Sequence, residues 1–284
     1  MIGLIAHSEK PEAPTAVRAM LKALKAHKIP CLLEKQTAAL VGRKSDRDPR
    51  ALARECELLV VMGGDGTILR VVHQLAERIR PIFGVNIGSL GFLTCVGMEE
   101  IPRAVESLRS KDYQLSPRNL LRAELTGSSG RPVRLHGLND VVISRGERSQ
   151  LVKIEVRIDG QELTHYNADG LIIATPTGST AYSISAGGPV LMPDSGAFVV
   201  TPICPHVLTN RSTVVSDRSV IEAHLLVPEK EVFVTVDGQS TRAMRVGDVL
   251  RIVKSDRTLP LVTLPERSFP EVLRQKLKWS GSNV

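Results

Sequence analysis

Residues 57–75, ELLVVMGGDGTILRVVHQL, place three glycines and one aspartate between two apolar segments. ELLVVM is a continuous apolar run, which is typical of a parallel strand covered on both faces. Beyond the glycines, Ile68, Val71, Val72 and Leu75 recur at helical spacing. The stretch therefore predicts a strand, a tight glycine-rich turn and a helix, the repeating unit of an open α/β sheet.

The sequence on either side repeats this pattern. IGLIA at residues 2–6 is typical of a buried strand, and a helical stripe that includes Met20 and Leu24 precedes a second short strand in IPCLLEK, residues 29–35. PIFGVNIG, residues 81–88, predicts a further strand that ends in glycine. We therefore expect a doubly wound, Rossmann-like α/β domain over residues 1–117.

The pattern changes after Ser116 and Pro117. Short alternating runs follow, and the Asp-Gly pairs at 159–160 and 237–238 are strong signals for two-residue β-hairpins. We expect a β-rich, β-sandwich-like domain over residues 118–265. Residues 266–284 contain a helical apolar pattern, and we expect this C-terminal helix to pack back on the first domain.

Composition limits the possible partners. Lys plus Arg number 37 against 30 Asp plus Glu, a net charge of +7, which suits an anionic partner and is equally explained by a solvated basic face. Aromatic residues make up only 3% of the chain, so the stacking platforms of single-strand binders are missing and no nucleic-acid partner is expected. No apolar stretch is long enough for a membrane span, so no membrane partner is expected either.

The cysteines indicate the redox environment. They lack the close spacing of metal ribbons or redox dithiols, so we expect reduced, small apolar residues and a cytoplasmic protein. They are Cys31, Cys56, Cys95 and Cys204.

The glycine motif lies where ligands bind in open α/β sheets, at the carboxyl end of a strand. Glycine allows close backbone approach, and the N–H groups at a helix start attract phosphate. The carboxylate of Asp65 would repel a phosphate, so its expected role is to position and deprotonate a hydroxyl group or to bind Mg²⁺. Arg70, one turn into the helix, could contact a phosphate or be a solvated residue. A tight turn in which Asp65 caps the helix explains the motif equally well. The expected phosphate loop consists of Gly63, Gly64, Gly66 and Thr67.

A second unusual stretch is NADGLIIATPTGSTAYSISAGGP, residues 167–189, where an apolar strand is followed by a loop dense in hydroxyls and glycines. With GGDGT, GVNIGSLGFLT at 84–94, the Asn-Asp pair at 139–140 and VDGQ at 236–239, it closely resembles the NAD kinase family. The motifs occur in the family's order from about Leu58 to Gln239.

The resemblance implies an ATP-dependent enzyme that phosphorylates the 2′-hydroxyl of the adenosine ribose of NAD to make NADP. It also implies an α/β amino-terminal domain, a β-rich carboxyl-terminal domain, and a homodimer or homotetramer. Mg²⁺ or another divalent cation should arrive with ATP, and we expect no metal tightly bound by protein ligands.

Site residues follow from the same resemblance. Asp65 matches the catalytic acid that engages the acceptor hydroxyl, Gly66 belongs to the nucleotide site, and Asn139 and Asp140 match the pair that holds adenine and ribose. Asp169 matches an acid on the nicotinamide side. The resemblance adds further substrate-binding positions at Asn167, Thr177, Thr180, Ala181, Tyr182, Ser185 and Gln239. Arg70 is added to them for its position one turn into the helix.

Other interpretations remain open from the residues alone. The Asn-Asp pair could be a polar loop before a strand, and Tyr182 could be packing. GGDGT also occurs in lipid and sphingoid kinases, and a similar loop occurs in phosphofructokinases; a non-catalytic NADP-binding regulator would share the scaffold. His136 and His165 lack ligand spacing and are expected to be ordinary hydrogen-bonded histidines. Polyphosphate as donor, NADH as acceptor and regulation are not decided by the sequence.

Overall fold

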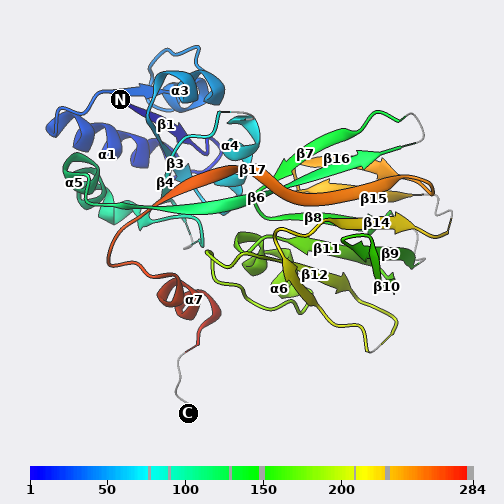
Figure 1. Cartoon of the computed structure of the whole chain (residues 1–284). Helices are drawn as coiled ribbons and strands as arrows, with labels where there is room; N and C mark the ends of the chain where they lie inside the picture. The colour runs from blue at the N-terminus through cyan, green and yellow to red at the C-terminus, as the bar shows by residue number, and fades with distance from the viewer. Residues whose placement is uncertain are drawn as a thin grey trace. The chain divides into compact units, whose positions relative to one another are not determined.

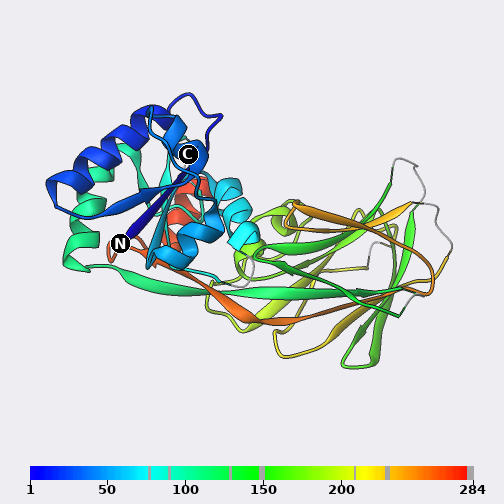
Figure 2. The ribbon, with the colours of Figure 1, turned by 90° about the horizontal axis from the view of Figure 1, so that it is seen from above.

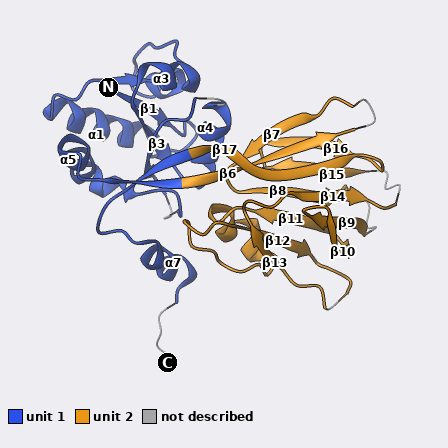
Figure 3. Cartoon of the chain, viewed as in Figure 1, with its two compact units in different colours: residues 1–117, 259–284 blue, residues 118–258 orange. Residues whose placement is uncertain are grey.

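The structure is a computed structural model that describes residues 1–75, 78–88, 91–127, 130–146, 151–207, 209–227 and 231–279. The chain divides into two compact units (Figure 3). Unit 1 comprises Met1–Pro117 and Leu259–Val284, and unit 2 comprises Arg118–Thr258.

Unit 1 is built on a parallel sheet in the order β2-β1-β3-β4, and β5 and the end of β17 both pair with β4 (Figure 1). Its strands are β1 (Ile2–Ala6), β2 (Cys31–Leu33), β3 (Leu58–Gly63), β4 (Ile82–Asn86) and β5 (Val96–Gly97). Its helices are α1 (Ala13–Ala26), α2 (Lys35–Ala39), α3 (Pro49–Glu55), α4 (Asp65–Leu75), η1 (Met98–Glu100), α5 (Ile101–Ser110) and α7 (Phe269–Leu277).

Helices cover both faces of this sheet (Figure 2). One face packs Val60 and Phe83 against residues of α1 and α5 such as Met20 and Val105. On the other face the sheet meets α3 and α4, and a Cβ on Gly84 would lie 2.9 Å from Cδ1 of Ile68. The doubly wound arrangement predicted from the apolar periodicity is confirmed.

Unit 2 consists of two sheets. One has the order β13-β12-β11-β8-β15-β16 and is antiparallel throughout; the other contains β10, β9, β14 and β17, with β6 paired to β17 and β7. The strands are β6 (Gln114–Thr126), β7 (Val133–Gly137), β8 (Asp140–Arg145), β9 (Val152–Ile158), β10 (Gln161–Ala168), β11 (Gly170–Ala174), β12 (Ala197–Ile203), β13 (Thr213–Ser216), β14 (Ile221–Leu225), β15 (Val232–Val236), β16 (Ser240–Met244) and β17 (Val249–Thr263).

The two sheets of unit 2 share one apolar core. Ile143 and Leu171 from the first sheet lie in the same buried cluster as Ile154 and Ala223 from the second. The β-sandwich-like fold expected for this region is therefore confirmed. Two short helical segments follow β11, namely η2 (Thr177–Thr180) and α6 (Tyr182–Ser185).

Both Asp-Gly pairs form hairpin turns. Asp159 and Gly160 have φ of 51° and 81° and join β9 to β10, while Asp237 and Gly238 have φ of 50° and 65° and join β15 to β16. Two consecutive positive φ values are those of a type I′ turn, which Asp-Gly favours. The hairpin predictions are confirmed.

The chain passes from unit 1 to unit 2 within β6 and returns within β17. The return begins at Leu259, so residues 259–265, expected from the sequence to belong to the β-rich domain, are part of unit 1. The end of β17 belongs there because Leu261 pairs with Ile82 of β4. Helix α7 also lies in unit 1, where the Phe269 ring is 6.2 Å from that of Phe92.

All four cysteines are free thiols; Cys56 and Cys95 are buried, Cys31 is half-buried and Cys204 is exposed. Among the described residues, no helix combines the length and apolar character that a membrane span requires.

Candidate functional site

The glycine loop joins the end of β3 to the start of α4. A Cβ on Gly63 would lie 2.3 Å from Oγ1 of Thr67, so packing within the loop requires glycine there. Gly64 and Gly66 differ, because a Cβ at either would meet no heavy atom within 4 Å and neither has a positive φ. Neither local packing nor backbone conformation explains these two glycines, which leaves room for a ligand against the backbone.

Asp65 occupies the first turn of α4 but does not cap that helix through its side chain. Its Oδ2 accepts a hydrogen bond from the N–H of Phe92 at 2.8 Å, and its Oδ1 accepts one from the N–H of Leu93 at 2.9 Å. Gly91 is required beside them, since a Cβ there would lie 2.0 Å from Oδ1. The capping interpretation is therefore wrong, and the carboxylate is held by the segment that follows β4.

Thr67 and Arg70 are the other sequence-predicted residues near this loop. Thr67 is buried, its N–H donates to the carbonyl of Gly64 at 2.9 Å, and its Oγ1 accepts weakly from the Gly64 N–H at 3.4 Å. Arg70 is half-buried one turn into α4. Ser89 and Leu90, from the segment quoted at 84–94, lie outside the described residues.

In unit 2, Asn139 and Asp140 meet the hairpin turn at Asp237. The Asp237 carboxylate accepts hydrogen bonds from the N–H groups of Leu138 at 2.7 Å, Asn139 at 2.8 Å and Asp140 at 3.0 Å. In return, the Asp237 N–H donates to the carbonyl of Asp140 at 3.0 Å. The turn thus fixes the backbone of the Asn-Asp pair, while the Oδ1 atom of Asn139 is buried without a hydrogen-bond partner in the described residues.

The segment after β11 packs against the backbone at the Asn-Asp pair. The Thr175 hydroxyl donates to the carbonyl of Leu138 at 2.6 Å and accepts from the N–H of Gly178 at 3.1 Å. A Cβ on Gly178 would lie 2.0 Å from the carbonyl oxygen of Asn139, so only glycine allows η2 to approach this closely. These contacts bring the loop of residues 175–185 to the end of the sheet where β8 begins and β11 and β15 end.

Several predicted binding residues of this loop differ in exposure. Thr177 is buried and Thr180 half-buried, with the Thr180 hydroxyl donating to the carbonyl of Thr177 at 3.2 Å. Ala181 follows η2 as its C-cap. The side chain of the next residue, Tyr182, is 47% exposed, so its ring is not a buried packing residue. Ser185 is also exposed, as is Gln239, which lies between β15 and β16.

Asp169 and Asn167 lie at the opposite end of β11 from the Asn-Asp pair. Asp169 precedes the first residue of β11, whereas Asp140 pairs with Ala174, its last residue. At about 3.3 Å per residue the two carboxylates are separated by roughly 16 Å along the strand. Asp169 accepts from Nε of Arg145 at 2.8 Å, and the carbonyl of Asn167 accepts from the N–H of His206 at 2.9 Å. The structure thus places the residues assigned to the nicotinamide side apart from those assigned to adenine and ribose.

Asp140 is the predicted site residue with the strongest electrostatic perturbation. Burial, with a smaller contribution from the nearby Asp237 carboxylate, raises the pKa of Asp140 to about 7. Such a shift on a carboxylate beside a candidate ligand site is a common sign of function.

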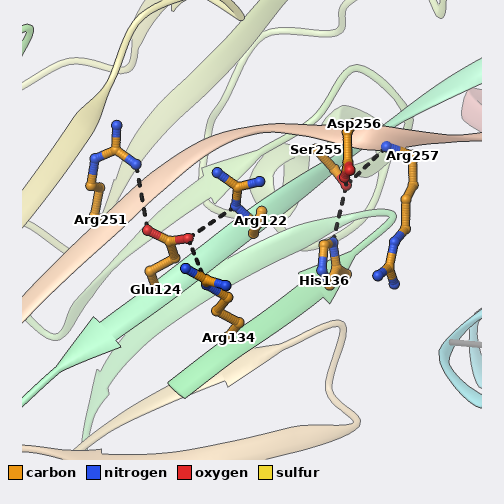
Figure 4. Close-up of polar contacts among 8 residues, drawn as sticks. All are labelled: Arg122, Glu124, Arg134, His136, Arg251, Ser255, Asp256 and Arg257. Carbon is orange, nitrogen blue, oxygen red and sulfur yellow. Dashed lines mark hydrogen bonds and ion pairs between the residues drawn. The ribbon is translucent and has the colours of Figure 1, made fainter. Parts of the chain in front are cut away.

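The basic residues of unit 2 are partly neutralised by acids. Figure 4 shows Arg122, Arg134 and Arg251 converging on Glu124, with N–O distances of 3.1, 3.1 and 3.4 Å. His136 hydrogen-bonds Ser255 at 3.0 Å, which confirms the expectation of an ordinary hydrogen-bonded histidine.

His165 belongs to the one cluster of the described residues whose ligand atoms lie close enough for a metal ion. It contains Glu155, Glu162 and His165. These groups are already paired, since His165 contacts Glu162 at 3.3 Å and Glu155 accepts from Arg157.

Comparison with known proteins identifies the family. The model of the ATP-NAD kinase N-terminal domain matches residues 2–113, and that of the ATP-NAD kinase C-terminal domain matches residues 138–264. The NAD kinase of Syntrophotalea carbinolica is 40% identical over 279 residues, covering 98% of each chain. The chain belongs to the NAD kinase family.

Other NAD kinases extend this likeness. The NAD kinase of Geotalea daltonii is 44% identical over 228 residues, 80% of each chain. Among solved structures, yeast NADH kinase complexed with NADH has a TM-score of 0.91 at 25% identity and covers all of this chain and 89% of its own. The NAD kinase from Archaeoglobus fulgidus in complex with ATP has a TM-score of 0.76 at 26% identity, covering 98% and 99%.

Membership of the NAD kinase family removes the lipid-kinase and phosphofructokinase alternatives. The structure also contains residues that shape the candidate site and that the motifs did not identify. Asp237, Thr175 and Gly178 organise the Asn-Asp pair although none was predicted as a site residue. The VDGQ and ATPTGST motifs contain all three, so their signal was present, but their partners lie far away in the sequence.

Proposed function

We propose that this chain transfers the γ-phosphoryl group of ATP to the 2′-hydroxyl of the adenosine ribose of NAD, making NADP and ADP. The observation that carries the proposal is the placement of Asp65 at the end of β3, with Gly64 and Gly66 open beside it. Family membership supports the choice of substrates.

In the proposed step, Asp65 orients the 2′-hydroxyl and takes its proton while the hydroxyl oxygen forms a bond to the γ-phosphorus. The bond from that phosphorus to the bridging oxygen breaks, and its electron pair leaves with ADP. The N–H groups of Phe92 and Leu93 each donate one hydrogen bond, to Oδ2 and Oδ1 of Asp65 respectively. Because each carboxylate oxygen can accept two hydrogen bonds, capacity remains for the hydroxyl.

The remaining roles follow the predicted assignments. Gly63, Gly64, Gly66 and Thr67 form the phosphate loop, with Arg70 one turn into the helix. Asn139 and Asp140 hold the adenosine half of NAD, and the exposed Tyr182 ring supplies a stacking surface. The remaining positions assigned to the dinucleotide are Asn167, Asp169, Thr177, Thr180, Ala181, Ser185 and Gln239.

Mg²⁺ or another divalent cation would enter with ATP, held mainly by the phosphates. It would neutralise their charge and polarise the transferred group. A homodimer or homotetramer and a cytoplasmic location belong to the same proposal.

The proposal is tested with γ-labelled ATP, Mg²⁺ and a panel of acceptors: NAD, diacylglycerol, sphingosine and fructose 6-phosphate. Label is expected on NAD alone. Robust labelling of one of the other three, with none on NAD, would overturn the proposal.

A further inference from the structure

Lys10 lies in the turn that joins β1 to α1, outside all the motifs quoted above. Its N–H donates to the carbonyl of His7 at 3.2 Å, and its carbonyl accepts from the N–H of Ala13 at 3.0 Å. These two hydrogen bonds fix the Lys10 backbone at the carboxyl end of β1, one strand away from the glycine loop.

The Lys10 side chain reaches beyond that neighbouring strand. A Cβ on Gly88 would lie 2.7 Å from Nζ of Lys10, and Gly88 follows the last residue of β4 by two positions. Since β3 lies between β1 and β4 in the sheet, the ammonium group extends across the carboxyl end of β3. That end is where Gly63 leads into the loop that carries Asp65.

Hydrogen bonds hold the three strand ends together at this edge. The N–H of His7 donates to the carbonyl of Met62 at 2.9 Å, and the N–H of Ile87 donates to that of Gly63 at 3.2 Å. The Asn86 side chain also makes two hydrogen bonds with Gly88, accepting from its N–H at 3.0 Å and donating to its carbonyl at 2.9 Å. The backbone beside the Lys10 ammonium group, at Gly88, is therefore held in place by hydrogen bonds.

The ammonium group has no counter-ion among the residues that the structure describes. Lys10 is half-buried, and no described carboxylate lies within 4.0 Å of its nitrogen. Asp65, the acid of the nearby loop, instead accepts from the backbone at 92–93. A partly desolvated cation without a partner favours a bound anion, and lysine binds phosphate as a point charge.

We propose that Lys10 binds the phosphate chain of the phosphoryl donor and offsets its charge beside the glycine loop. This inference rests on the proposed function and adds a donor-binding residue to it. The donor is preferred over the dinucleotide because Lys10 and the phosphate loop share one sheet edge, whereas the Asn-Asp pair belongs to unit 2.

The test compares Lys10→Met, Lys10→Arg and the control Lys22→Met, which removes an exposed lysine from α1. For Lys10→Met we expect KM for ATP to rise by about 10- to 100-fold, with KM for NAD within about twofold of wild type. Lys10→Arg should recover much of the loss, and Lys22→Met should behave as wild type. Calorimetric binding of inorganic tripolyphosphate should weaken in parallel with the ATP effect.

Unchanged ATP KM and tripolyphosphate affinity in Lys10→Met would overturn the inference, as would a rise in KM for NAD alone. Urea unfolding checks that the variant is folded, and Lys10→Gln replaces it if it is not. If wild type makes no NADP, the proposed function fails, but tripolyphosphate binding to wild type and Lys10→Met still decides the role of Lys10.

Discussion

At the scale of single residues, Asp65 has both a structural contact and a proposed chemical role. Its two oxygens accept from two consecutive backbone N–H groups 27 and 28 residues further along the chain. An uncharged side chain of the same size can replace only part of this arrangement, because Asn offers one oxygen and one NH₂ group. The structural and catalytic consequences of a substitution must therefore be measured separately.

We predict that Asp65→Asn lowers kcat by roughly 10² to 10⁴, the usual cost of removing a general base. We also predict a loss of about 1–3 kcal/mol in the free energy of unfolding, because the new NH₂ group would face a backbone N–H. Steady-state kinetics and urea unfolding measure the two effects, with Asp46→Asn, an exposed carboxylate, as control. A near-normal kcat in a folded Asp65→Asn protein would remove Asp65 from the chemistry.

Asp140 makes stability depend on pH. Because its pKa is about 7 in the folded chain against an ordinary 3.8, the unfolded chain releases the proton first as pH rises. The contribution of this group to stability is therefore complete below about pH 4 and is lost as pH rises towards 7. The full loss is on the order of 4 kcal/mol.

Asp140→Asn should remove this dependence. We predict that urea unfolding from pH 5 to pH 8 shows a smaller fall in stability for Asp140→Asn than for wild type, and that the variant is the more stable protein at pH 8. The exposed Asp112→Asn serves as control. Parallel pH profiles for wild type and Asp140→Asn would contradict the assignment of a raised pKa.

At the scale of elements, the close approach of η2 to the start of β8 depends on Gly178. We predict that Gly178→Ala destabilises the protein by about 1–3 kcal/mol and weakens NAD binding, because the added methyl group would displace the Asn139 backbone. Gly196→Ala is the matched control, since its added Cβ would meet no described atom closer than 3.7 Å. Unfolding and NAD titration give the result, and equal behaviour of the two variants would contradict the prediction.

Helix α7 supports the segment that holds Asp65. The Phe269 ring packs beside Phe92, whose N–H donates to Asp65. We predict that Phe269→Ala lowers kcat by about tenfold through misplacement of the carboxylate, with KM for NAD unchanged. Phe269→Leu, which keeps an apolar side chain, should recover most of the activity. An unaffected kcat in a folded Phe269→Ala protein would show that α7 does not position the acid.

Secondary structure was largely predictable because it depends on local patterns. The apolar periodicity around Ile68 and the Asp-Gly pair at 237–238 each determine structure within a few residues. The contacts that build the candidate site join distant positions. Asp237 meets the N–H of Leu138 across 99 residues, and no local pattern contains that information.

At the scale of the whole molecule, the doubly wound unit 1 and the sandwich of unit 2 were both predicted from the sequence. The motifs also selected the residues at the two strand ends, Asp65 in one unit and the Asn-Asp pair in the other. Lys10 was missed because it belongs to no motif, and its importance depends on the order of β1, β3 and β4. The return of the chain to unit 1 at Leu259 was missed because β17 continues as one strand through the boundary.

The most direct test of the proposed reaction is the position of the new phosphate. Purified protein is incubated with MgATP and NAD, and the dinucleotide product is isolated and examined by phosphorus NMR. The account predicts one new phosphomonoester on the 2′-oxygen of the adenosine ribose, formed in equal amount with ADP. A phosphate on any other hydroxyl, or ADP released with inorganic phosphate and unchanged NAD, would contradict it.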